Sequence, residues 1–170
     1  MWLPLFELSQ VYDEVYNWFD HLIKDGCHIL GYVIMPNHLH CILFPTNQEK
    51  PLNKLVAEGK RFMAYGIVKR LKKNQQSEIL DKLSDGVQEN EIKKGKKHQV
   101  FRLSFDAKMC NNISMLETKL DYAHRNPVSG KWNLAEDYTD YVHSSASFYD
   151  KGKDNKYVSH YKRLMNEIEI

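Results

Sequence analysis

The sequence predicts an α+β fold in which helices pack on antiparallel strands. Segments with the helical spacing of apolar residues are interleaved with shorter segments of strand character. The two clearest strands, at about 27–35 and 38–44, are joined through Pro36-Asn37, which indicates a tight antiparallel connection. The chain of 170 residues is about one domain long, and we find no internal repeat or interdomain linker.

The first half of the chain is expected to hold two helices around these strands. A helix capped by Ser9 should run to about Asp25, where Gly26 closes it. The apolar face of this helix comprises Val11, Val15, Trp18, Phe19 and Leu22. A longer helix fits residues 52–73, because its apolar positions recur at helical spacing opposite much of a basic cluster.

The second half is predicted to hold a third strand and a further long helix. Residues 75–98 are polar, with a hint of a short helix before a Lys-rich loop, and 99–105 alternate as a strand would. Ser114 and Glu117 have the spacing of a capping box, so a helix should begin near Met115. Pro127 should end or kink that helix.

The last part of the chain is expected to anchor on the domain and then become polar. The anchoring candidates are Trp132, Leu134, Tyr138 and Tyr141. We therefore expect one domain over residues 1–150 and a polar C-terminal tail over 151–170, with a terminal helix from about Ser159.

Composition is that of an ordinary globular protein and excludes several classes. The chain is 42% hydrophobic and 27% charged, which argues against disorder. No apolar run approaches the length of about 20 residues that spans a bilayer, and no signal-peptide pattern is present, so we expect a cytoplasmic protein without a membrane partner. Cys27, Cys41 and Cys110 show no CxxC spacing and are expected to be reduced, partly buried thiols rather than a zinc site.

Positive charge is concentrated although the net charge is only +2. Such clusters are usually solvated surface, and the alternative is a face that follows the phosphates of a nucleic acid. One cluster comprises Lys54, Lys60, Arg61, Lys69, Arg70, Lys72 and Lys73, and a second comprises Lys93, Lys94, Lys96 and Lys97.

The most specific local pattern is the pair His38 and His40, separated by Leu39. On a strand the two imidazoles point to the same face, where they could bind a divalent metal ion. A His-x-His pair alone is more often a pair of ordinary surface residues than a metal-binding site.

A second pattern raises the odds that this pair is functional. Tyr122 and Asn126 lie one turn apart on the predicted helix, roughly 80–120° from Leu116 on its apolar stripe. A phenol and a carboxamide would thus share a side face, where a neighbouring sheet could place the histidines opposite them. Without further support, Tyr122 would be an ordinary surface phenol, and Asn126 an ordinary helix-end residue before Pro127.

These two patterns resemble the HUH single-tyrosine transposases, and among them the REP-associated tyrosine transposase-like group. The His-hydrophobic-His motif is matched by His38-Leu39-His40 within the phrase from Tyr32 to His40. The tyrosine-bearing helix is matched by Tyr122-x-x-x-Asn126-Pro127-Val128, and a further family-like segment spans 141–146. The likeness covers roughly residues 2–149 in the expected order.

The resemblance implies a fold and a reaction. The fold is a ferredoxin-like or RRM-like sheet with the HUH motif on a central strand, and the family's first strand is expected to be missing before residues 2–6. The activity is cleavage and rejoining of single-stranded DNA at a hairpin through a 5′-phosphotyrosine on Tyr122. Mg²⁺ or Mn²⁺ would be bound by His38, His40 and Asn126, and the basic residues of 52–73 would contact DNA.

Two function classes follow, and they differ in whether the protein acts catalytically. The first is an active DNA endonuclease and strand transferase, associated with the nucleoid; the second is a domesticated or catalytically impaired DNA-binding relative. The intact motif residues favour the first class and the missing strand favours the second. A homodimer also remains open, because many members of the family are twofold dimers whereas REP-associated members can act as monomers.

Overall fold

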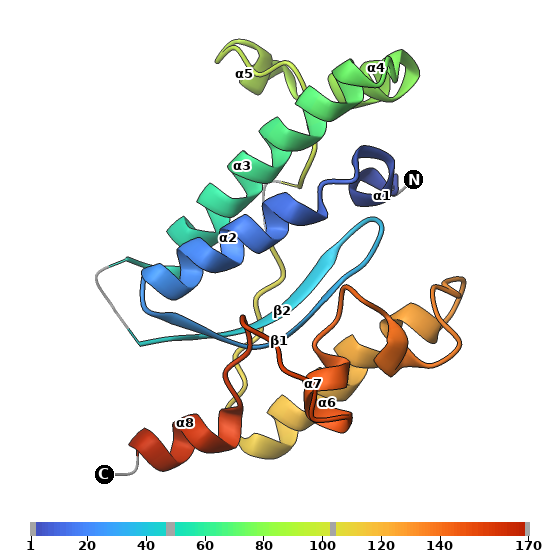
Figure 1. Ribbon diagram of the computed structural model, residues 1–170. Coiled ribbons are helices and arrows are strands. Elements are labelled where there is room, and N and C mark those ends of the chain that lie inside the picture. The colour runs from blue at the N-terminus through green and yellow to red at the C-terminus, as the bar shows by residue number, and fades with distance from the viewer. Residues whose placement is uncertain (1–2, 47–49, 103–104, 169–170) are drawn as a thin grey trace.

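A computed structural model describes residues 3–46, 50–102 and 105–168. Helices and a single β-hairpin make up the regular structure of these residues (Figure 1). The elements, in chain order, are α1 (Leu5–Ser9), α2 (Tyr12–Lys24), β1 (Cys27–Ile34), β2 (Leu39–Pro45), α3 (Leu52–Lys73), α4 (Ser77–Asp85), α5 (Glu89–Ile92), α6 (Ile113–Arg125), α7 (Ala146–Asp150) and α8 (Tyr161–Ile168), with 3₁₀ turns at Asn126–Val128 and Tyr138–Asp140.

The hairpin lies between two layers of helices (Figure 1). One face of the hairpin packs on α1, α2 and α3 through the largest core cluster, which includes Phe19, Tyr32 and Ile67. The other face packs on α6 and α8 through Leu30, Leu120, Tyr161 and Leu164. The α+β class predicted from the sequence is confirmed in this coarse form.

Glycines allow two close contacts, one between the hairpin and α6 and one between α3 and α2. A Cβ added to Gly31 on β1 would lie 2.2 Å from Leu120 Cδ2 on α6. A Cβ added to Gly59 on α3 would lie 2.4 Å from the Trp18 indole nitrogen on α2. Side chains at either glycine would push a helix away from its neighbour, since interiors are close-packed.

In the described residues, β2, which carries His40, is an edge strand of a two-stranded sheet rather than a central strand. There β2 pairs only with β1, and its side chains from Leu39 to Phe44 are half-buried on both faces. By contrast, β1 is almost wholly buried, and its other edge meets Val158 and Ser144 through isolated bridges. The inner strand of this sheet is therefore β1, and the expected central position of the motif strand is corrected.

The strand predicted at 99–105 does not form in its described residues, 99–102 and 105. The Gln99 amide donates to Leu83 O at the end of α4, and Phe101 packs edge-on against Phe6 with ring centroids 6.1 Å apart. The alternating pattern thus marks a segment that inserts an aromatic residue between helices rather than pairing with the sheet. Leu103, on which the prediction also relied, lies outside the described residues.

The other elements agree with the sequence apart from their ends. Helix α3 has the predicted bounds, the N-cap of α2 is Val11, two residues after the predicted Ser9, and the short helices α1, α5 and α7 were not predicted. Helix α6 begins at Ile113 because Asn112 is its N-cap, with the Met115 amide donating to Asn112 Oδ1 at 2.8 Å. The predicted capping box at Ser114 is therefore wrong by two residues.

The segment predicted as a polar tail contributes to the core. Tyr161 and Leu164 on α8 are buried against α6 and β1, and the Ser159 amide donates to Ile29 O. Of the four anchoring candidates, Trp132, Leu134 and Tyr141 pack against Val33, Met35 and Ala123, whereas Tyr138 is half-buried beneath Arg125.

All three cysteines are unpaired, and burial raises the pKa of the Cys27 thiol to about 11.

Among the described helices, none combines the length and apolar character needed to cross a bilayer.

Candidate functional site

The side of the hairpin that faces α6 carries the two motif histidines. Strand residues alternate between faces, so Leu39, Cys41 and Leu43 enter the α1–α3 core while Ile42 and Phe44 pack toward α6. By the same alternation, His40 lies on the side of β2 that carries Ile42 and Phe44 and faces α6. His38 immediately precedes β2, in the turn that Met35 closes by donating its amide to His38 O at 2.8 Å.

The two imidazoles converge on one point. His38 Nε2 and His40 Nε2 are 3.1 Å apart, and their rings are nearly perpendicular. His38 Nδ1 donates to Asn37 Oδ1 at 2.6 Å, because a carboxamide oxygen can only accept. This hydrogen bond fixes the tautomer in which neutral His38 carries its lone pair on Nε2, facing His40.

This arrangement fits two ligands of a shared divalent ion. Ligands about 2.1 Å from an ion and at right angles to one another are about 3.0 Å apart, close to the separation of the two Nε2 atoms. Among the described residues, no group of three or more His, Cys, Asp or Glu side chains is gathered as for a metal ion. The histidine pair would therefore need oxygen ligands of another kind, such as a carboxamide, water or phosphate.

Electrostatics keep both imidazoles neutral near pH 7. Burial, followed by the neighbouring His40, lowers the pKa of His38 to about 4. Burial, followed by the positive charge of Lys119, lowers the pKa of His40. A neutral imidazole is the form that binds metal ions.

Tyr122 lies against this pair. Its ring meets the ring of His40 at 77° with centroids 5.4 Å apart, and 58% of the residue is exposed. Helix α6 places it there because Leu120 and Ala123 on its buried side pack on β1. The structure thus brings the predicted tyrosine and the predicted histidines together from two distant parts of the chain.

Asn126 lies one helical turn beyond Tyr122. Its Nδ2 donates to Tyr122 O at 2.7 Å, and within the described residues its Oδ1 makes no hydrogen bond. The oxygen that a metal ion would prefer is therefore the atom left for a ligand. No hydrogen bond joins Asn126 to either histidine in the part of the chain that the structure describes.

Lys119 lies close enough to His40 to act on it, although no sequence pattern predicted it. It is half-buried on α6, one turn before Tyr122, and its charge acts on His40. The spacing of three residues could have revealed it, since positions three apart share a helix face. Its ammonium group can attract a phosphate to the surface that the histidines and Tyr122 line.

The predicted DNA-contacting residues are not part of this site. All seven lie on α3, which packs with α1 and α2 on the opposite face of the hairpin (Figure 1). Two of them are engaged within the protein: Lys60 donates to Arg102 O, and Arg70 binds Asp13 at 2.5 Å and also donates to Gln10 O.

Two other histidines have structural roles. His124 is buried and within 2.8 Å of Ser145 Oγ, which ties α6 to the backbone of Tyr32. His143 stacks on Tyr12 with ring centroids 3.9 Å apart. Tyr65 is on α3 and therefore lies across the hairpin from His38.

Comparisons with known proteins add no relative: no family model, no curated protein and no solved structure matches this chain. The case for a function is therefore made by the geometry and by the motif residues.

Proposed function

We propose that this protein cleaves and rejoins single-stranded DNA at a hairpin by means of Tyr122, as a metal-dependent endonuclease and strand transferase. The observation that carries the proposal is the contact of Tyr122 with His40, whose Nε2 is 3.1 Å from that of His38. An exposed phenol beside two convergent neutral imidazoles is what phosphodiester attack by a tyrosine requires. The resemblance to the HUH transposases is independent support.

The bond changes of the proposed step are simple. The Tyr122 phenol oxygen forms a bond to phosphorus and loses its proton, while the bond from phosphorus to the 3′ oxygen breaks and that oxygen gains a proton. The products are a 5′-phosphotyrosine and a free 3′-OH, so the bond energy is kept for rejoining. No general base is assigned to Tyr122.

The residues divide the remaining work. His38, His40 and the Oδ1 of Asn126 would hold Mg²⁺ or Mn²⁺, which when bound would neutralise and polarise the scissile phosphate. Two nitrogens and an amide oxygen form a softer set than Mg²⁺ prefers, so Mn²⁺ should support higher activity in vitro. Asn37 holds His38 in the tautomer that this role needs.

The proposal is tested by trapping the covalent product. The purified chain is incubated with a fluorescently labelled DNA hairpin carrying single-stranded flanks, in Mn²⁺, Mg²⁺ or EDTA, and resolved by denaturing gel electrophoresis. An SDS-resistant adduct that needs the metal ion is the expected result. Absence of the adduct, and of any cleaved strand, across hairpins of varied sequence would refute it and leave the domesticated DNA-binding protein as the better reading.

A further inference from the structure

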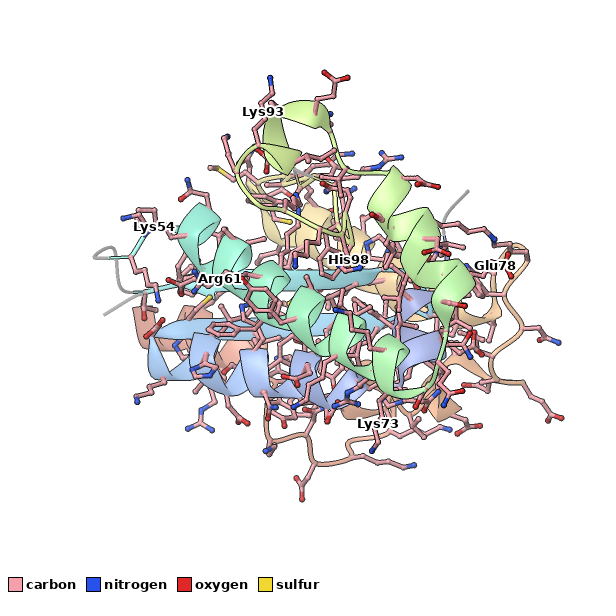
Figure 2. The ribbon with its side chains drawn as sticks, turned by 90° about the horizontal axis from the view of Figure 1, so that it is seen from above. Lys54, Arg61, Lys73, Glu78, Lys93 and His98 are labelled. Carbon is pink, nitrogen blue, oxygen red and sulfur yellow. The ribbon has the colours of Figure 1, made fainter. Side chains whose placement is uncertain are left out.

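The face of α3 that points away from the hairpin is unusual in composition. At about 100° per residue, a single arc of roughly 120° contains five cations, two aromatic rings and one carboxylate. We call the seven cationic and aromatic members the α3 strip: Lys54, Arg61, Phe62, Tyr65, Lys69, Lys72 and Lys73. All seven are exposed, and the strip is about 28 Å long at 1.5 Å per residue. Figure 2, which looks down on this layer, shows Lys54, Arg61 and Lys73 spread along α3.

The positive charge of the strip is not neutralised by ion pairs among the described residues. In the described residues its five cations form no ion pair with a carboxylate, unlike Arg70 on the neighbouring face. The one carboxylate of α3, Glu58, is held by Lys50 at 2.6 Å. Counter-charge must therefore come from solvent ions or from a bound polyanion.

The fold adds a second basic segment along the flank of the strip. Burial, followed by Lys96, lowers the pKa of Lys60, and burial, followed by Lys72 and Lys97, lowers the pKa of His98. These influences place the loop after α5 beside α3, although some 25 to 35 residues separate the two segments in the chain. Of the four lysines of this loop, Lys94 and Lys96 are paired with Glu91, and Lys97 adds positive charge near His98, on which Lys72 of the strip also acts.

The two rings of the strip are not required by the core. Phe62 and Tyr65 are 50% and 68% exposed, whereas the buried side of α3 is already filled by Leu55, Met63 and Ile67. Phe62 lies beneath Arg61 and stacks on His21, while no ring stacking or cation–π contact of Tyr65 is found in the described residues. Exposed rings among uncompensated cations are the combination with which proteins bind unpaired bases.

We propose that the α3 strip binds unpaired nucleotides of a DNA strand, as a second surface across the hairpin from Tyr122. The cations would follow the phosphates and Tyr65, with Phe62 beside it, would stack on a base. A membrane fits less well, because the apolar side of α3 is buried and only two rings remain to insert. The choice of DNA as the nucleic acid rests on the proposed function, while the binding chemistry of the strip does not.

The experiment measures binding by fluorescence anisotropy, with labelled dT20 and a labelled duplex of equal length. The full chain carrying Tyr122→Phe serves as the parent, so that cleavage does not interfere. Tyr65→Ala should weaken dT20 binding by about tenfold, since stacking contributes roughly 1–3 kcal/mol per base, and should change duplex binding by less than about twofold. The triple change Lys69→Gln, Lys72→Gln and Lys73→Gln should weaken both and reduce the salt slope of dT20 binding by about two, near 0.7 per phosphate contact.

The matched control removes three lysines that are paired within the protein: Lys82→Gln, Lys151→Gln and Lys156→Gln. Equal loss in this control, or unchanged binding in the strip variants at an unchanged melting temperature, would overturn the proposal. Binding of phosphatidylserine vesicles in place of dT20 would overturn it as well. If dT20 binding depends on the strip but no covalent adduct forms, the proposed cleavage is refuted and the binding role of the strip stands. If an adduct forms but dT20 binding does not depend on the strip, the binding role is refuted and the proposed cleavage stands.

Discussion

The two faces of the β-hairpin differ in chemistry. The α6 face holds two neutral, half-buried imidazoles and a phenol, with Lys119 beside them. The α3 face holds uncompensated positive charge and exposed rings. The sequence predicted both sets of residues without placing them relative to each other, whereas the structure puts them on opposite faces of the hairpin. Cleavage and affinity should accordingly respond to different mutations.

The alternation of side chains along β2 creates this separation. His40 points toward α6, and its neighbours Leu39 and Cys41 enter the core beneath α2 and α3. A shift of one residue in the pairing of β2 with β1 would exchange the two rows and bury the imidazoles under α2. The turn at Pro36-Asn37 and the tight contact at Gly31 hold the register that keeps them apart.

The largest effect is expected at Tyr122. Tyr122→Phe keeps the ring packed on His40 and removes only the attacking oxygen, so the covalent adduct should disappear while the melting temperature barely changes. Tyr65→Phe is the matched control from the other face and should form the adduct in full yield. Undiminished adduct in Tyr122→Phe would show that another residue is the nucleophile.

Loss of either imidazole should be nearly as severe for cleavage. His38→Ala or His40→Ala should reduce cleavage by at least about a hundredfold, but leave hairpin affinity within about twofold, because affinity comes mainly from basic side chains. Gel assays of cleavage and anisotropy of binding separate the two effects. His21→Ala, on α2, should leave cleavage unchanged. Full activity of either motif variant in Mg²⁺ or Mn²⁺ would remove the metal assignment.

The two contact glycines test whether the faces are mechanically independent. Gly31→Ala and Gly59→Ala should each reduce the free energy of unfolding by about 1–3 kcal/mol, since each Cβ would overlap a neighbouring side chain. At a temperature where both variants are folded, Gly31→Ala should slow cleavage by displacing α6 and Tyr122, and Gly59→Ala should mainly weaken binding through α3. Gly86→Ala, whose Cβ would meet nothing closer than 3.6 Å, is the control. Equal effects of the two variants on cleavage would mean that the faces are coupled.

Lys119 should have a smaller effect, mainly on the cleavage rate. Lys119→Gln removes the charge beside His40 and should lower the cleavage rate by about tenfold, equivalent to about 1.4 kcal/mol of transition-state stabilisation. Lys119→Arg should restore part of the rate because it keeps the charge. Lys131 is an exposed lysine that lies over Trp132, and Lys131→Gln should leave the cleavage rate unchanged. A rate unchanged in Lys119→Gln would exclude the residue from the site.

The sequence predicted the local part of this picture well. The periodicity of the apolar residues was enough to predict α3 and the hairpin, because those patterns are strong and uninterrupted. The contact between Tyr122 and His40 agrees with the expectation that a sheet could place the histidines opposite the tyrosine's helix face. These successes depend on features that a strand or a helix carries by itself.

The failures concern tertiary context. The alternation of Phe101 and Phe105 could not reveal that the segment inserts between helices, because a strand forms only where a partner edge is in reach. The sequence pattern of α3 likewise could not show that this Lys-rich helix lies across the hairpin from the histidines. Ser144 and Val158 form bridges with β1 although they are more than 100 residues away in the sequence, and no local pattern predicts such contacts.

The smallest expected effect concerns the stability of the α6 face in acid. Burial lowers the pKa of His124, although Asp150 and Asp121 oppose the shift, so the folded protein binds a proton there less readily than the unfolded chain. Its contribution to stability is present above the unfolded pKa of about 6.5 and is lost as the pH falls below it toward the lower, folded pKa. Protonation would also put a charge in the buried contact between His124 and Ser145.

The measurement is the melting temperature at pH 7.5 and pH 5 for the parent, His124→Gln and His21→Gln. The parent and His21→Gln should lose the same amount on acidification, and His124→Gln should lose less. We expect a difference of a few degrees at most, because 1 kcal/mol corresponds to about 2–4 °C in a chain of this length. If His124→Gln were as acid-sensitive as the parent, the acid response of the α6 face would have to come from other groups.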